Sequence, residues 1–150
     1  MSFFCSRGYT FPEAIAVLLI FSVLAAVPFI HFSSAYENAR EDHFVKQLEA
    51  DLVYSQHYAY SYNTSTRMEW KQEENYYILR GNDRNKLYIH RTIPEGFFSP
   101  TTSKIFFEEI SYNGNGAIKK PGTIILHGPS QSYRFIFQIG RGRLRVEKSP

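Results

Sequence analysis

Histidines and serines are the residues of this chain whose chemistry would most readily support catalysis. A metalloprotease helix needs two histidines four residues apart with a glutamate between them, and no histidine pair has that spacing. None of Ser65, Ser111 and Ser130 lies in a G-x-S-x-G turn, and no phosphate-binding loop is present. The sequence therefore predicts no enzyme, no cofactor and no metal site. The histidines are His31, His43, His57, His90 and His127.

A glutamate at the mouth of an apolar stretch is the next chemically unusual feature. From Ala14 to Tyr36 no residue carries a formal charge, and Ala14 to Ile30 is interrupted only by Ser22 and Pro28. With its flanks this stretch approaches the ~20 residues that a transmembrane helix needs. Glu13 directly precedes it. Because an ionised acid costs ~2.5–3.5 kcal/mol at a bilayer centre, Glu13 needs a partner at that depth.

The residues before the stretch resemble the leader of type IV prepilins and type II secretion pseudopilins. The sequence Gly8-Tyr9-Thr10-Phe11-Pro12-Glu13 follows Arg7. In that family a short basic leader ends in glycine, followed by an aromatic residue, often threonine, two variable residues and glutamate. The resemblance implies that a prepilin peptidase cuts after Gly8 and methylates the new amine of Tyr9. That amine would pair with Glu13 and guide assembly.

The only cysteine, Cys5, precedes this cleavage point, so the mature chain would carry no disulfide and no cysteine-bound zinc. Two other interpretations of the N-terminus stay open. Ser33-Ser34-Ala35 offers the small residues of a secretory signal cleaved before Tyr36. An unprocessed single-span anchor would instead be held by Arg7 on the inner side of the membrane.

A long helix is expected after the leader. Glu37 to Tyr60 contains no glycine or proline, and its apolar residues recur at helical spacing, which predicts an amphipathic helix. These residues are Phe44, Val45, Leu48, Leu52 and Ala59. A continuous helix from Tyr9 to near Tyr62 gives four segments. They are a cleaved leader (1–8), a transmembrane and assembly helix (9–32), its amphipathic second half (33–62) and a β-rich head (63–150).

Short runs of β-branched and aromatic residues, separated by turn signals, predict strands in the head. We expect an α+β, pilin-like fold in which one antiparallel sheet packs on a helix whose first half is embedded in the membrane. Positive φ angles are expected at Asn113-Gly114 and in the turn at Gly140-Arg141-Gly142. The expected strands are Arg67–Lys71, Tyr76–Arg80, Lys86–Thr92, Lys104–Ile110, Thr123–His127, Tyr133–Ile139 and Arg143–Glu147.

The stretch from Lys104 to Lys148 resembles the pseudopilin H-like family, with an Asn-Gly hairpin and two final strands around Gly-Arg-Gly-Arg. Its ending, from Phe137 onward, resembles the tail of a competence pseudopilin of Gram-positive bacteria. The resemblance implies a minor pseudopilin, a structural subunit of a DNA-uptake (competence) pilus. Its partners would be other competence pseudopilins, the prepilin peptidase and the cell membrane. One helix would cross that membrane, with the head outside the cell. A type II secretion pseudopilin is the alternative within this class.

The C-terminal strand is basic on one face. Arg141, Arg143 and Arg145 alternate, with Leu144 and Val146 opposite. This pattern fits a solvated face that protects an edge strand from aggregation. It also fits DNA contacts, which would make the chain a membrane-tethered surface DNA-binding module. The net charge of +3 establishes neither. Arg134 and Lys148 are the other candidate DNA contacts, and the tyrosines at 54, 58, 60 and 62 are expected to pack against the sheet.

Overall fold

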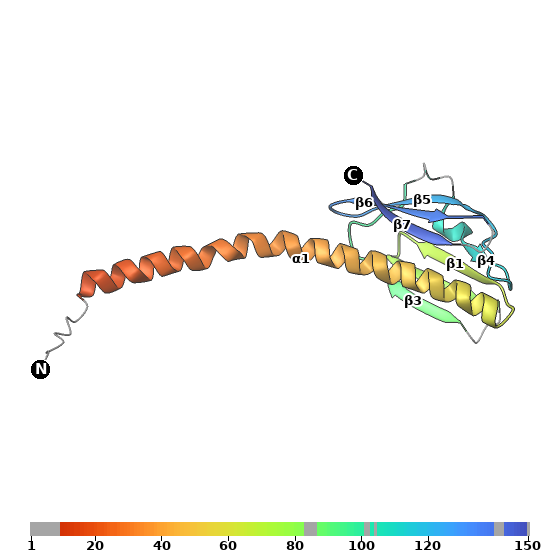
Figure 1. Ribbon diagram of the computed structural model, residues 1–150, viewed down its shortest axis with the longest axis horizontal. Coiled ribbons are helices and arrows are strands. Elements are labelled where there is room, and N and C mark those ends of the chain that lie inside the picture. The colour runs from red at the N-terminus through yellow and green to blue at the C-terminus, as the bar shows by residue number, and fades with distance from the viewer. Residues whose placement is uncertain (1–9, 83–86, 101–102, 104, 140–142, 150) are drawn as a thin grey trace, which may run out of the picture. The chain divides into compact units, whose positions relative to one another are not determined.

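The computed structural model describes residues 10–82, 87–100, 103, 105–139 and 143–149, with the backbone alone for residues 24–35. Contacts between residues divide the chain into two units, Met1–Ala39 and Arg40–Pro150. The division falls inside helix α1, which runs from Phe11 to Ser61. The second half of α1 therefore belongs to the β-rich unit (Figure 1).

Backbone hydrogen bonds define both ends of helix α1. The carbonyl of Thr10 accepts hydrogen bonds from the amides of Glu13 and Ala14, at 3.0 and 3.1 Å. At the other end Asn63 has a φ of 46°. The amide of Thr64 then reaches back to the carbonyl of Ala59 at 3.1 Å. A left-handed asparagine with this six-residue bond is a Schellman motif, which satisfies carbonyls that the helix leaves free.

The predicted core positions of the helix are confirmed. Leu48, Leu52 and Ala59 have no exposed surface, and Phe44 and Val45 are almost fully buried.

Among the described residues, no helical stretch is both long and apolar enough to cross a bilayer.

The strands form two antiparallel sheets. The four-stranded sheet has the order β3-β2-β1-β4 and the three-stranded sheet the order β5-β6-β7. Cross-strand partners include Trp70 with Tyr77 in the first sheet and Phe135 with Val146 in the second. The strands are β1 (Thr66–Lys71), β2 (Tyr76–Gly81), β3 (Tyr88–Thr92), β4 (Ser111–Tyr112), β5 (Gly122–His127), β6 (Ser132–Phe137) and β7 (Leu144–Ser149).

These sheets correct the predicted fold class. The expectation of one pilin-like sheet is wrong, because β5, β6 and β7 pair as a three-stranded sheet separate from the four-stranded sheet. The membrane-embedded half of the helix is not found in the described part of the chain. The strand predicted at 104–110 is also wrong. Its described residues include a short 3₁₀ helix, η1 (Phe107–Glu109), of which Phe107 is buried in the core.

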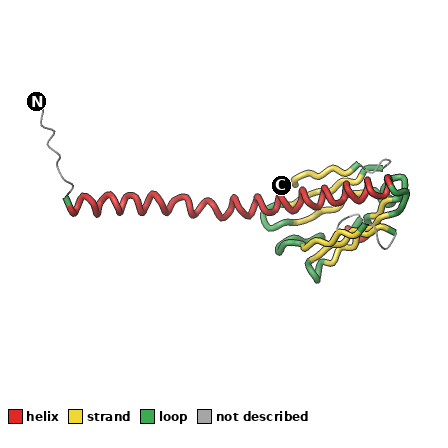
Figure 2. Tube along the Cα trace, turned by 90° about the horizontal axis from the view of Figure 1, so that it is seen from below, coloured by secondary structure: helices red, strands yellow, loops and turns green. Residues whose placement is uncertain are grey.

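A chain of aromatic rings joins the two sheets into one core. Phe107 stacks on Trp70 of β1 with ring centres 4.5 Å apart, and meets Phe135 of β6 edge-on at 5.7 Å. From the helix, Phe44 contacts Tyr77 of β2 and Phe97 at 6.3 and 4.6 Å. Figure 2 shows the strands gathered beside the C-terminal half of α1. The two sheets therefore share one hydrophobic core with the helix.

The turn at 113–116 fits closely against the end of the helix. The positive φ lies at Gly116 (74°), so the expectation for Asn113-Gly114 is wrong at both residues. Gly114 is needed for space: a Cβ there would lie 2.6 Å from Oδ1 of Asn63 and 2.8 Å from its carbonyl carbon. The side chain of Gln56 donates to the carbonyl of Gly116 at 2.8 Å. The other predicted glycine turn, at 140–142, lies outside the described residues.

Candidate functional sites on the helix and the two sheets

The predicted assembly site is only partly described. Gly8 and Tyr9 lie outside the described residues. Glu13 is exposed in the first turn of α1, and its carboxylate suits the positive end of the helix dipole. The large apolar side chains on either side of it are exposed, with Phe11 at 80% and Phe21 at 70%. Exposed apolar surface of this extent marks a site that contacts lipid or another protein.

A buried carboxylate fastens the helix to the four-stranded sheet. Oδ2 of Asp51 accepts a hydrogen bond from the hydroxyl of Tyr77 at 2.7 Å and pairs with Nε of Arg91 at 3.3 Å. Asp51 is 8% exposed. Burial, reinforced by the bond to Asp51, raises the pKa of the Tyr77 hydroxyl far above its ordinary value. One helical turn further on, Oγ of Ser55 donates to Oγ1 of Thr66 at 2.9 Å in β1.

Two other acids of α1 hold the three-stranded sheet. Oε1 of Glu41 accepts the amide of Ser130, in the turn between β5 and β6, at 2.8 Å. Asp42 accepts the hydroxyl of Tyr133 at 3.0 Å and the ammonium of Lys148 at 2.9 Å. The bonds from Lys148 and Tyr133 hold the pKa of the Asp42 carboxyl below its usual value. The sequence analysis missed these acids, because nothing in a helical pattern shows which strand a polar residue will meet.

The predicted basic face is divided by the structure. Arg134 and Arg145 both pair with Glu147, at 3.5 and 2.9 Å. Arg145 lies opposite the core-facing residues Leu144 and Val146, as the alternation predicts. Lys148 lies on the core side of β7, where it binds Asp42. Of the remaining candidates, Arg143 is exposed and Arg141 lies outside the described residues. The candidate DNA contacts therefore do not form one free cationic face.

The outer face of the four-stranded sheet, turned away from the core, repeats this arrangement and adds aromatic rings. Glu69 pairs with Arg67 at 3.4 Å and with Arg80 at 3.6 Å. The guanidinium of Arg80 lies 5.8 Å from the ring centre of Tyr88 on β3. His90, two residues along β3, has its ring centre 6.5 Å from that of Tyr88, with the ring planes 14° apart.

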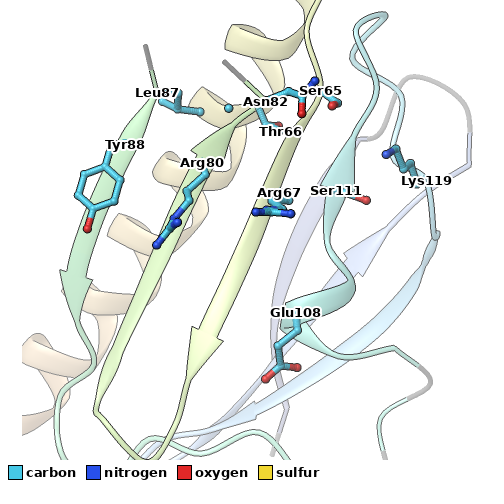
Figure 3. Close-up of a pocket in the computed structure, with 11 residues that line it drawn as sticks. Ser65, Thr66, Arg67, Arg80, Asn82, Leu87, Tyr88, Glu108, Ser111 and Lys119 are labelled. Carbon is cyan, nitrogen blue, oxygen red and sulfur yellow. The ribbon is translucent and has the colours of Figure 1, made fainter. Parts of the chain in front are cut away.

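A pocket opens on this face. Its volume is about 800 Å³, and its walls include Arg67, Arg80, Tyr88 and Lys119 (Figure 3). The figure shows Arg80 and Tyr88 on neighbouring strands, with Glu108 and Lys119 across Arg67 from them. Sequence reasoning did not find this pocket. In a strand, Tyr76 and Arg80 share one face, and so do Tyr88 and His90. The sequence does not show that these two strands are neighbours in a register that places Arg80 beside Tyr88.

The tyrosines at the end of α1 were expected to pack against the sheet. Tyr58 is buried, with its ring 4.5 Å from that of Tyr62. Tyr54, Tyr60 and Tyr62 are exposed, so the expectation is wrong for these three. Among the described residues, no three histidine, cysteine or acidic side chains gather as a metal site requires.

No protein-family model, no curated protein and no solved structure matches this chain.

Proposed function

We propose that this chain is a minor pseudopilin, a structural subunit of a DNA-uptake pilus in transformation. The exposed apolar residues of α1 that follow Glu13 carry the proposal. The leader pattern around Gly8 supports it from the sequence. After prepilin peptidase has cut the chain, the chain is held at the cell membrane with the β-rich unit outside. Helix α1 then packs beside the corresponding helices of other pseudopilins.

Glu13 has a specific part in this proposal. Its carboxylate lies among Phe11, Ile15 and other exposed apolar side chains. Between packed helices or in lipid, an unpaired carboxylate is costly, so it favours a position where a cation is available. Cleavage after Gly8 supplies that cation as the free amine of Tyr9 on a neighbouring subunit. The charge pair sets the register of the incoming helix.

The processing step is tested by measuring the mass of the N-terminal peptide of protein recovered from membranes. Cells with a prepilin peptidase should give a chain that starts at Tyr9 and carries one methyl group, and cells without the enzyme should give Met1. A start at Tyr36, or an uncut chain in both strains, would overturn the proposal.

The assembly step is tested by Glu13→Gln. Cleavage should stay normal, while co-purification with the other pseudopilins after cross-linking should fall about tenfold or more, because the partner amine loses its counter-charge. Glu37→Gln is the matched control, since Glu37 is an exposed glutamate of the same helix beyond the apolar stretch. Equal recovery of both variants with their partners would remove the role of Glu13.

A further inference from the structure

We infer that the outer face of β1, β2 and β3 binds single-stranded nucleic acid. Tyr88 and its aromatic neighbours stack on bases, and Arg67, Arg80 and Lys119 contact phosphates. This surface uses neither the apolar helix nor the arginines of β7. The inference therefore stands independently of the pilus proposal.

The aromatic half of the site is a group of rings on one sheet face. The register places Tyr88 beside Arg80 and His90 beside Ile78, so these residues share the face opposite the core. Tyr88 is 64% exposed although it lies in a strand. The ring of Tyr76 lies 4.8 Å from that of His90, which extends the group across to β2. Exposed rings of this kind are sequence-tolerant stacking platforms, because every base has a π face.

The cationic half of the site is held in place by Glu69. Its two oxygens pair separately with Arg67 and Arg80, which keeps both guanidinium groups over the sheet. A guanidinium has five N–H donors, so each arginine retains donors for a phosphate after pairing with one carboxylate oxygen. Arg80 also lies 5.8 Å from the centre of the Tyr88 ring, which places phosphate and base contacts side by side.

The pocket beside these residues has room for part of the chain of a nucleic acid. Its volume of about 800 Å³ is within the range of ligand sites, and Lys119 and the hydroxyls of Ser65 and Ser111 add donors. Glu69 and Glu108 bring two negative charges to the same face as the three cations. Binding must therefore depend on stacking as well as on charge. Three phosphate contacts predict a slope of about −2 for log affinity against log salt.

The outer face of the three-stranded sheet provides an internal contrast. It has the same ionic arrangement, with Arg134 and Arg145 around Glu147, but its arginines lie beside Ile125 and Ile136. His127, further along β5, is stacked on Phe98. The arginines of this face thus have aliphatic neighbours, whereas Arg80 of the other face has Tyr88. Comparing the two faces therefore separates the contribution of aromatic rings to nucleic-acid binding from the contribution of charge.

The experiment measures fluorescence anisotropy of a labelled oligothymidylate of about twenty nucleotides, which exceeds the site size of such folds. The purified full-length chain in neutral detergent is titrated at low salt. Tyr88→Ala should weaken binding about fivefold or more, and Tyr88→Phe should retain it, because the ring remains. The pair Arg67→Gln and Arg80→Gln should weaken binding and reduce the salt slope by more than 1.

The matched control is the pair Arg134→Gln and Arg145→Gln, which removes the same charge from the other sheet and should leave binding unchanged. Trp70 fluorescence verifies that each variant is folded. The inference is overturned if the wild type does not bind, or if the control pair weakens binding as much as the test pair. Equal competition by inorganic polyphosphate or by duplex DNA would also overturn it, because neither offers unpaired bases.

Discussion

The two sheets are fastened to the same helix by the same kind of group, a carboxylate, but in different surroundings. Asp51 is buried beneath the four-stranded sheet, where it bonds Tyr77 and Arg91. Asp42 lies at the edge of the three-stranded sheet, where Tyr133 and the partly exposed Lys148 reach it. A buried acceptor that loses its donor pays the full cost of desolvation, whereas water replaces the donor at an edge. Of these two bonds between a tyrosine and a carboxylate, the one to Asp51 should therefore be the more costly to break.

Phe107→Ala should have the largest effect, because this ring connects the sheets through Trp70 and Phe135. We expect a loss of about 3–5 kcal/mol in the free energy of unfolding, typical of a buried phenylalanine. Trp70 fluorescence reports on the four-stranded sheet, and amide exchange of β5 and β6 reports on the other. The two sheets should lose stability together, in one unfolding transition. Separate transitions would show that the sheets do not share one core, and the exposed Phe98→Ala should change stability by less than about 1 kcal/mol.

The same substitution in each sheet compares the two attachments directly. Tyr77→Phe removes the hydroxyl from buried Asp51 and should cost about 1–3 kcal/mol. Tyr133→Phe leaves Asp42 with Lys148 and should cost about 0.5–1.5 kcal/mol. Urea unfolding of both variants gives the two values. A larger loss at Tyr133 would reverse the comparison.

These attachments also show where prediction from the sequence ends. The spacing of Leu48 and Leu52 predicts buried helix positions, because the α-helical period is fixed by backbone geometry. The aromatic and β-branched residues at 105–110 suggest a strand, but among them Phe107 supplies a ring to the core from η1. The apolar composition of this stretch is consistent with the burial of Phe107. It does not determine whether the backbone forms a strand or a 3₁₀ helix.

Strand pairing is the other limit. Most predicted strands lie within one or two residues of observed ones, yet their division into two sheets was missed. Alternation within a strand shows which side chains face the core, while the choice of neighbouring strand depends on contacts distant in sequence. Asp42 and Lys148 illustrate this, because 106 residues separate them along the chain. The pocket of Arg67, Arg80 and Tyr88 was missed for the same reason.

Asp42→Asn should remove the contribution of Asp42 to the pH dependence of stability. The folded-state pKa of Asp42 is depressed, so its contribution is complete above the unfolded value of about 4 and is lost as the pH falls through the folded value. The variant should be less stable than wild type by about 1 kcal/mol or less near neutral pH. The difference should shrink below pH of about 4. Chemical unfolding at several pH values tests this, and a gap that widens in acid would contradict it.

The smallest effects are expected at the two glutamates that bridge arginines on the outer faces. Glu69→Gln and Glu147→Gln each break exposed pairs, so each should change stability by less than about 1 kcal/mol. Oligothymidylate binding should distinguish them. Glu69→Gln should tighten it a few-fold, because it removes a negative charge beside Arg67 and Arg80 while the amide oxygen can still accept a bond from an arginine. Glu147→Gln should leave it unchanged. Equal binding by both variants would remove the functional difference between the faces.

The contact between Asn63 and Gly114 has a consequence for the divergence of this chain. The left-handed end of α1 and the turn at 113–116 approach so closely that any side chain at position 114 would meet the backbone of Asn63. Exposed residues of the sheets have no such steric constraint, so many different side chains can replace them. We therefore expect distant relatives to keep a glycine about fifty residues after the asparagine that ends their long helix. This pair would identify them after overall similarity has been lost.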